Sequence, residues 1–305
     1  MSNGAIVTVA SWEPRFLDSS KALISERPNT PVYVVRSERY ADWTGDACSA
    51  LEAHCASKGS KFNEIKFDFE APGDLWSNVV KFGSRLVDDG ISTVALDGTT
   101  TPRELTWYFL HLFGEHRIPT EYFYVPADEY GPWLSKESLT PRLVLKRSGI
   151  VYPDKPTCVV AMSGFDIGRL NQLLSYYEPA RVEIARQIGL RYDNIDRNAP
   201  GLSEYARHAH IFDFDAFDLS GTSHQILKQR IEPLLDEYNV LLASLGPKLS
   251  SVTAFEVTEQ LPSVALVYIP SSSYSKEYSK GANLAARARK AIDFAPVVAA
   301  PPGGC

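Results

Sequence analysis

Apolar runs rich in β-branched residues alternate with amphipathic segments along this chain of 305 residues. The apolar runs are short and end in polar turns, which is typical of buried parallel strands. The segments between them repeat apolar residues at helical spacing, most clearly across residues 78–87. Strands that alternate with helices at these lengths predict an α/β fold, with a parallel or mixed sheet covered by helices on both faces.

The clearest unit covers residues 92–125 and consists of a strand, a polar loop, a helix and a second strand. The loop has the sequence DGTT at residues 97–100, and residues 101–104 combine a capping-box spacing with a proline at the first predicted helical position. Such a loop leaves free N–H groups at the helix start, where the helix dipole attracts an anion. In an open α/β sheet such a loop lies beyond the carboxyl end of a strand, and this is the edge of the sheet where ligands bind. The alternative is an ordinary crossover whose loop only caps the helix.

A second, weaker copy of the pattern follows later in the chain. The sequence IFDFDA at residues 211–216 echoes KFDFEA at residues 66–71, and each is followed by helix, strand, turn, helix and strand in the same order. The interval suits two domains of ordinary size. We therefore expect an internal duplication with two Rossmann-like domains, at residues 1–148 and 149–294, and a disordered tail at residues 295–305. Residues 283–291 are predicted to form a basic helix.

Composition excludes several classes of protein. The chain is 44% hydrophobic and 22% charged, as in globular proteins, and no apolar run is long enough to span a bilayer. The N-terminus has no signal-peptide pattern, so a cytoplasmic protein without membrane contact is expected. The net charge of −6 gives no general attraction to nucleic acid, so direct nucleic-acid binding is not expected.

Neither a metal nor an organic cofactor is predicted. The cysteines Cys48, Cys55, Cys158 and Cys305 form no Cys-x-x-Cys motif, and no histidine lies at metal-site spacing from them, so reduced thiols are expected. His208 and His210 alternate along one strand without acidic partners, which favours a packing role. The turn at residues 163–169 lacks the three-glycine spacing of a dinucleotide fingerprint, so neither NAD nor FAD is predicted.

Candidate ligand contacts follow the first strand of each half. Ser11, Trp12, Glu13 and Arg15 place a hydroxyl, a carboxylate and a guanidinium at the predicted ligand edge, and Arg15 suits a bidentate phosphate contact. The alternative is an Arg15–Glu13 pair at a helix start capped by Ser11. The predicted ligand-binding residues of the whole chain are Ser11, Trp12, Glu13, Arg15, Asp97, Gly98, Thr99, Thr100, Thr101, Ser163, Asp166, Arg169, Gly246 and Lys248.

The hydroxyl-rich segment 271–281 carries Lys276 and Lys280 and follows the last predicted strand of the second half. It is suited to closing over a phosphorylated ligand. A mobile surface loop is the alternative interpretation, and the residues alone do not separate the two.

The loop Asp97-Gly98-Thr99-Thr100-Thr101, between a strand and a helix, resembles that of the second-messenger-sensing CRISPR-associated Rossmann fold (CARF) domains. That family carries an Asp/Asn-x-Thr-Gly-Gly-Thr type of loop after its fourth strand and a polar loop after its first. The resemblance implies that residues 97–101 are the fourth-strand loop, that residues 11–13 are the first-strand loop, and that Gly246 and Lys248 belong to the equivalent loop of the second copy. The paired glycines of the family are threonines here, and no fused nuclease domain is visible.

Two classes of function are weighed, with a third left open. The first is a sensor-like protein that binds a nucleotide or a phosphorylated small molecule, in a prokaryotic defence or stress system, with an effector protein encoded nearby. The second is a hydrolase or transferase acting on a nucleotide or phospho-sugar, with Asp97, Glu13 or Asp166 as base and Arg15, Arg169 or Lys248 as phosphate clamp. The third is a structural partner whose clefts are vestigial.

Overall fold

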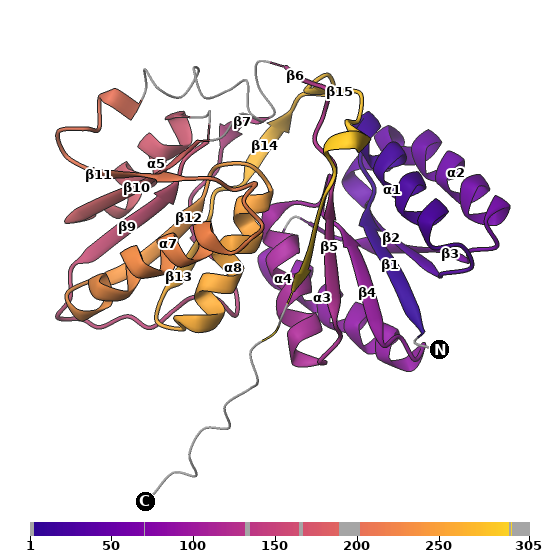
Figure 1. Cartoon of the computed structure of the whole chain (residues 1–305), viewed down its shortest axis with the longest axis horizontal. Helices are drawn as coiled ribbons and strands as arrows, with labels where there is room; N and C mark the ends of the chain where they lie inside the picture. The colour runs from indigo at the N-terminus through magenta and orange to yellow at the C-terminus, as the bar shows by residue number, and fades with distance from the viewer. Residues whose placement is uncertain are drawn as a thin grey trace, which may run out of the picture.

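The computed structural model describes residues 3–69, 71–131, 135–164, 167–188, 202–292 and 294. Within these residues the chain forms two six-stranded mixed sheets, each flanked by helices, and the two sheets stand next to each other (Figure 1). The predicted α/β fold with helices on both faces of the sheets is therefore confirmed. The described residues include no helix that is long and apolar enough to cross a membrane.

The first sheet has the strand order β16-β5-β4-β1-β2-β3. Strands β1 to β5 are parallel, and β16 is antiparallel to β5. Its elements are β1 (Gly4–Val9), α1 (Pro14–Glu26), β2 (Val32–Ser37), η1 (Glu38–Tyr40), α2 (Ala41–Ser57), β3 (Phe62–Phe67), α3 (Pro72–Asp88), β4 (Thr93–Asp97), α4 (Arg103–Glu115), β5 (Thr120–Tyr124) and β16 (Ala288–Ile292). Helices α1 and α2 cover one face of this sheet, and α3 and α4 cover the other.

The second sheet has the order β11-β10-β9-β12-β13-β8, with β8 antiparallel to β13. Its elements are β8 (Arg142–Leu143), β9 (Thr157–Met162), α5 (Ile167–Tyr177), β10 (Arg181–Gln187), β11 (His210–Phe214), α7 (Thr222–Ile231), η2 (Glu232–Asp236), β12 (Asn239–Ser244), α8 (Leu249–Gln260) and β13 (Ala265–Tyr268). Read from the antiparallel edge strand inwards, both sheets have the same order. A common origin of the two halves by duplication stays a prediction.

Each sheet takes its antiparallel edge strand from beyond the predicted boundary at residues 148 and 149. Strand β8 precedes that boundary yet joins the second sheet, and β16 lies near the end of the chain yet joins the first. The prediction of a basic helix at residues 283–291 is wrong, because β16 and the short helix η3 (Leu284–Ala286) occupy this segment. Arg289 of β16 binds Glu121 of β5 at 3.0 Å, so pairing with the sheet edge outweighs local helix propensity.

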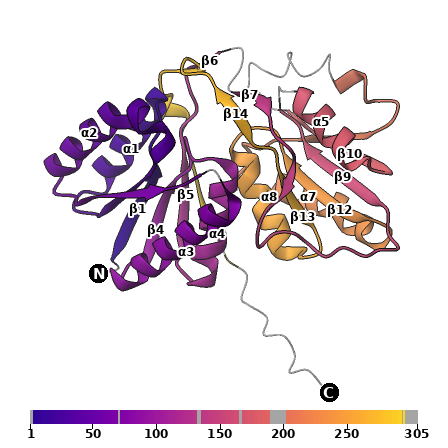
Figure 2. The same ribbon diagram turned by 180° about the vertical axis from the view of Figure 1, so that it is seen from behind.

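The chain passes between the two halves twice, and the two connecting segments pair with each other as antiparallel strands. Strand β6 (Glu129–Tyr130) pairs with β15 (Ser279–Lys280), and β7 (Ser135–Ser138) pairs with β14 (Ser271–Tyr274). We call these four strands the bridging ribbon; Figure 2 shows β7 and β14 side by side between the halves. The segment 271–281, for which closure over a ligand and a mobile loop were both considered, is therefore largely paired as part of this ribbon.

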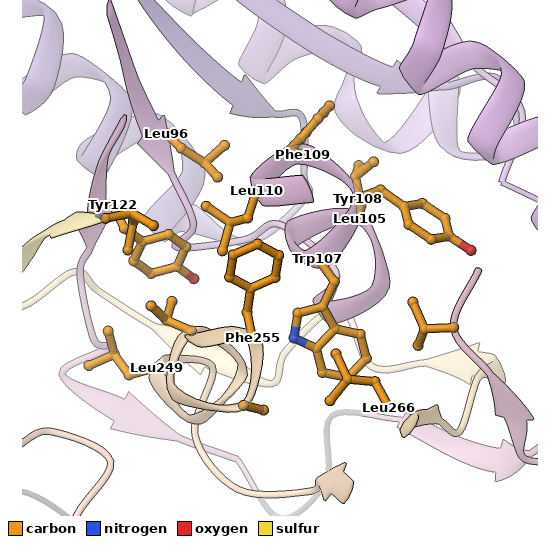
Figure 3. Packing of buried hydrophobic residues seen from close by; sticks show 14 of the residues in the cluster. Leu96, Leu105, Trp107, Tyr108, Phe109, Leu110, Tyr122, Leu249, Phe255 and Leu266 are labelled. Carbon is orange, nitrogen blue, oxygen red and sulfur yellow. The ribbon is translucent and has the colours of Figure 1, made fainter. Parts of the chain in front are cut away.

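Helices α4 and α8 join the halves through a shared hydrophobic core. Helix α4 is buried on nearly all sides, because one side packs on the first sheet and the other packs on α8. Trp107 is fully buried and donates a hydrogen bond from Nε1 to the Ser251 carbonyl at 2.8 Å, next to Phe255 (Figure 3). This packing fixes the carboxyl ends of the two sets of parallel strands relative to each other.

Candidate functional site

A cavity of about 460 Å³ lies where the carboxyl ends of the parallel strands of the two sheets meet. The first half contributes residues that follow β1, β2 and β4, and the second contributes residues from α5 and from the segments after β12 and β13. Part of the bridging ribbon forms a further wall. The position agrees with the general placement of ligand sites in open α/β sheets, and the volume lies in the range of small-molecule pockets. We call this space the interdomain cavity.

The wall of the interdomain cavity is rich in positive charge. Of the described residues, five basic and two acidic side chains line it, although the whole chain has a net charge of −6. They are Arg39, Arg103, Arg142, Arg169, Lys248, Glu13 and Glu104. Both acids are already in ion pairs: Glu104 with Arg142 at 2.8 Å and Glu13 with Arg15 at 2.5 Å. Basic side chains therefore outnumber acidic ones on this wall, which suits the cavity to an anion.

Arg15 does not line the cavity. Its side chain is 2% exposed, and its Nε and Nη2 donate to Oε2 of Glu13 at 3.2 and 2.5 Å. Its Nη1 donates to the Val125 carbonyl at 3.4 Å and to the Tyr130 hydroxyl at 3.3 Å. The prediction that Arg15 clamps a phosphate is therefore replaced by the alternative, a buried Arg15–Glu13 pair at the start of α1.

Glu13 is held in its ionised form by these surroundings. Burial favours the neutral acid, but the charges of Arg15 and Lys248 outweigh it and lower the pKa of Glu13. The Ser279 hydroxyl of the bridging ribbon donates to the carboxylate at 2.7 Å, and the Glu13 N–H donates to the Ser11 hydroxyl at 3.2 Å. Glu13 and Ser11 both border the cavity, but Glu13 is engaged as the centre of a buried ionic network.

Asp97 lies beneath the loop that follows β4 and does not line the cavity. It is 1% exposed, and its Oδ2 accepts hydrogen bonds from the hydroxyls of Ser19 at 2.7 Å and Ser20 at 3.1 Å. Its Oδ1 accepts from the Thr99 N–H at 3.0 Å. Burial raises the pKa of Asp97, against the effect of these hydrogen bonds. The prediction of Asp97 as a ligand contact or base does not fit this position, since the carboxylate orders the loop from behind.

The other residues of this loop also serve its conformation. A Cβ on Gly98 would lie 2.0 Å from the ring of Tyr122, so only glycine fits there. Thr99 accepts from the Val125 N–H at 3.0 Å, and Thr101 donates to the Asp97 carbonyl at 2.8 Å. Of the five loop residues, only Thr100 borders the cavity.

The predicted capping box at the start of α4 is absent. The helix begins at Arg103, one residue after the proline that was expected to lie inside it. Glu104 does not return to the N-terminal backbone, since its carboxylate binds Arg142 at 2.8 and 3.2 Å. The long-range ion pair between Glu104 and Arg142 is formed in place of the local cap, and the neighbouring Arg103 lies at the cavity wall.

In the second half, too, some of the predicted residues line the cavity and others only support the local backbone. Ser163 is buried and accepts from the Gln187 N–H at 3.2 Å. A Cβ on Gly246 would lie 2.6 Å from the Ser163 carbonyl oxygen, so this glycine serves a close approach of two backbone segments. Asp166 lies outside the described residues. Arg169 and Lys248 line the cavity, and Arg169 contacts the hydroxyls of Ser135 and Ser271 in the bridging ribbon.

Two reciprocal contacts connect the loops that follow β4 and β12. Lys248, from the second half, donates from Nζ to the Thr101 carbonyl at 3.1 Å, and Arg103, from the first half, donates to the Gly246 carbonyl. Burial, together with the charges of Arg15 and Arg103, lowers the pKa of Lys248 to about 7, although Glu13 acts in the opposite direction. Lys248 therefore changes its charge near neutral pH.

Aromatic rings form one end of the cavity. Trp12, Tyr40 and Tyr274 line it, and the ring centroids of Trp12 lie 5.1 Å from Tyr40 and 5.8 Å from Tyr274. The indole N–H of Trp12 donates to the Ser275 carbonyl at 3.2 Å, which fixes the ring against the ribbon. Rings held in this way offer faces on which a planar group could stack.

Several cavity residues were not predicted from the sequence. Arg39 and Tyr40 follow β2, and Arg103 follows the loop after β4, so the rule that ligands bind beyond strand ends could have found them. Tyr274 lies in the segment 271–281, which was already considered as a ligand cover, whereas no such signal was available for Arg142, which reaches the cavity from the edge strand β8. The described residues contain no cluster of three or more His, Cys, Asp or Glu side chains that could hold a metal ion.

Comparison with protein-family models and with curated proteins gives no match. Among solved structures, protein VC1899 from Vibrio cholerae is 10% identical with a TM-score of 0.33, and the match covers 39% of this chain and 30% of that protein. A UDP-N-acetylglucosamine 2-epimerase is 12% identical with a TM-score of 0.29, covering 86% of this chain and 88% of the epimerase. A putative universal stress protein from Pseudomonas aeruginosa is 10% identical with a TM-score of 0.27, covering 87% and 92%. Similarity at this level assigns no function.

Proposed function

We propose that the interdomain cavity binds a nucleotide or another phosphorylated small molecule and that the protein acts as a sensor-like binder. The observation that carries the proposal is the convergence of basic side chains from both halves on one cavity, in a protein of negative net charge. Arg103 comes from the first half, and Arg169 and Lys248 come from the second. Guanidinium groups match the geometry of phosphate oxygens. The aromatic end, with Trp12 and Tyr40, favours a ligand that also carries a planar base.

The alternative is an enzyme that uses Asp97 or Glu13 as base. Its support is weaker, because Asp97 is sealed beneath its loop and Glu13 is a paired carboxylate of lowered pKa, which makes it a poor proton acceptor at neutral pH. Arg169 lines the cavity and is compatible with either function. Turnover of a bound compound would separate the two functions.

The finer part of the proposal, sensing of a second messenger in a prokaryotic defence or stress system, rests on the resemblance of the loop at residues 97–101 to CARF domains. The equal strand order of the two halves is consistent with a tandem of such domains. An effector protein encoded nearby and a cytoplasmic location belong to this same proposal. Co-purification with the product of a neighbouring gene, dependent on ligand, is the result that would support it.

A panel of phosphorylated compounds, measured by thermal melting and calorimetry, tests the binding proposal. A ligand that binds only the native state at a hundredfold excess over Kd adds about 2.7 kcal/mol to the free energy of unfolding. We expect nucleotides to raise Tm and the corresponding nucleosides to have much smaller effects. An unchanged Tm with every phosphorylated compound, beside a working positive control, would reject the proposal.

Ligand affinity is expected to fall as pH rises through neutrality. Lys248 has a pKa of about 7, so it is mostly charged at about pH 6 and mostly neutral at about pH 8, and only the charged form attracts an anion. Glu13, Arg15, Arg103 and Asp97 also act on this amine electrostatically, and the pKa of Glu13 is lowered, which keeps it ionised over this range. Calorimetry with a phosphodiester, whose own charge is constant here, should show several-fold weaker binding at the higher pH.

The matched control for this pH effect is Lys248→Met, which has no titrating amine. Its affinity for the same phosphodiester should be lower and nearly independent of pH. A wild-type affinity that does not vary across the range would show that Lys248 does not change charge beside the ligand.

A further inference from the structure

Lys248 has an unusual position for a lysine. Its side chain is partly buried at the wall of the interdomain cavity, and its amine donates to a backbone carbonyl, that of Thr101, at 3.1 Å. Among the described residues, no carboxylate lies within ion-pair distance of its Nζ. A buried lysine without a direct counter-ion is unfavourable as an ammonium and is suited to chemistry as a neutral amine.

The groups around Lys248 also favour its neutral form. Arg15 and Arg103 are permanent cations that oppose its protonation. The nearby carboxylate of Glu13 cannot compensate fully, because it accepts hydrogen bonds from Arg15 and from Ser279. A desolvated lysine beside other cations is a recurring arrangement for an amine nucleophile.

The same cavity contains groups that would hold an anion beside the amine. Arg103 donates to the Gly246 carbonyl, two residues before Lys248 in the chain, and Arg169 lines the cavity from α5. A ligand whose phosphate binds these guanidinium groups would have the rest of its structure confined to the cavity with Lys248 in its wall. Confinement of this kind raises the effective concentration of a reactive group next to the amine.

We propose that Lys248 forms an imine with a phosphorylated aldehyde or ketone bound in the interdomain cavity. The inference rests on the proposed binding of phosphorylated molecules at this site and adds a covalent reaction there. The lone pair of Nζ attacks the carbonyl carbon, the carbonyl π-electrons move to oxygen, and proton transfer from nitrogen to oxygen gives a carbinolamine. Loss of the hydroxyl group and of the remaining N–H proton as water gives the C=N bond, with no oxidant or reductant required.

Pyridoxal 5′-phosphate is a suitable probe, because it combines an aldehyde, a phosphate and a planar ring. The full-length protein is incubated with it, the imine is reduced with borohydride, and peptides are mapped by mass spectrometry. We expect the dominant adduct at Lys248, with labelling that rises through about pH 7. At about pH 8 its neutral fraction exceeds that of an ordinary exposed lysine on the order of a hundredfold. Inorganic phosphate should suppress the adduct, and unphosphorylated pyridoxal should give less of it.

Lys248→Arg retains a long basic side chain but forms no imine and should lose the dominant adduct, whereas Lys81→Arg, on the exposed side of α3, should keep it. Because the wild-type peptide map gives the result independently, a poorly folded variant would not decide the test. Labelling spread evenly over exposed lysines such as Lys81 would overturn the proposal. If phosphate displaces the probe yet Lys248 carries no adduct, the imine is rejected and anion binding stands. If the probe also fails to bind, both are rejected.

Discussion

Replacement of Arg15 by methionine is expected to lower the free energy of unfolding by about 3–5 kcal/mol, because it leaves the carboxylate of Glu13 buried without its cation. For a chain of this size the corresponding fall in Tm is roughly 5–8 °C. Thermal melting of the variant without ligand is the measurement. The size of the effect follows from burial, since both side chains of this pair are almost inaccessible to water.

Two further variants make this result specific. The double variant Glu13→Gln with Arg15→Met removes both charges and should recover much of the lost stability. Arg186→Met breaks the exposed pair with Asp213 and should change the stability by less than about 1 kcal/mol. If Arg15→Met instead kept its melting temperature and lost ligand binding, Arg15 would be a phosphate contact and the buried pair would be misassigned.

Removal of a cavity arginine is expected to weaken binding of a phosphorylated ligand by about 10- to 100-fold, which corresponds to the loss of one or two charge-assisted hydrogen bonds. The variants are Arg103→Met and Arg169→Met, one from each half of the molecule. Both should weaken binding, because the cavity is built from both halves. Calorimetric titration with the tightest-binding compound of the panel gives the affinities.

Arg186→Met serves as the control here as well, because Arg186 lies on β10 and does not line the cavity. Its affinity should match that of the wild type. Arg169 also contacts the bridging ribbon, so the Tm of each variant is measured first, and affinities are compared only between folded proteins. Unchanged affinity in both cavity variants would contradict binding of the phosphorylated ligand in the interdomain cavity.

The sequence predicted the fold well because the fold depends on regular patterns. Alternation of apolar strands and amphipathic helices determines an α/β architecture from local information. The edge strands β8 and β16 were not predicted, because their place in the sheets is decided by long-range pairing. Arg289 and Lys290 look like part of a basic helix until Glu121 and Glu256 are found opposite them.

A cavity lies at the predicted edge of the sheets, but only some of the predicted residues line it. Ser11, Trp12, Glu13, Thr100, Arg169 and Lys248 line the cavity, as their positions beyond strand ends suggested. Asp97 and Arg15 carry charged groups that could bind a ligand, but both side chains are turned inward. Asp97 accepts a hydrogen bond from Ser19, and Arg15 donates to Glu13. Whether a polar side chain at a strand end faces a ligand or its own loop depends on neighbours that a single sequence does not reveal.

Hydrogen–deuterium exchange of the full chain, with and without the tightest-binding phosphorylated compound, tests the central claim most directly. The claim is that both halves bind one ligand between them, so backbone N–H groups next to the cavity should exchange more slowly in the complex. We predict protection in segments 98–103 of the first half, 246–249 of the second half and 271–275 of the bridging ribbon, with little change on the outer helices α2 and α7. Protection confined to one half, or found away from all three segments, would contradict a shared interdomain site.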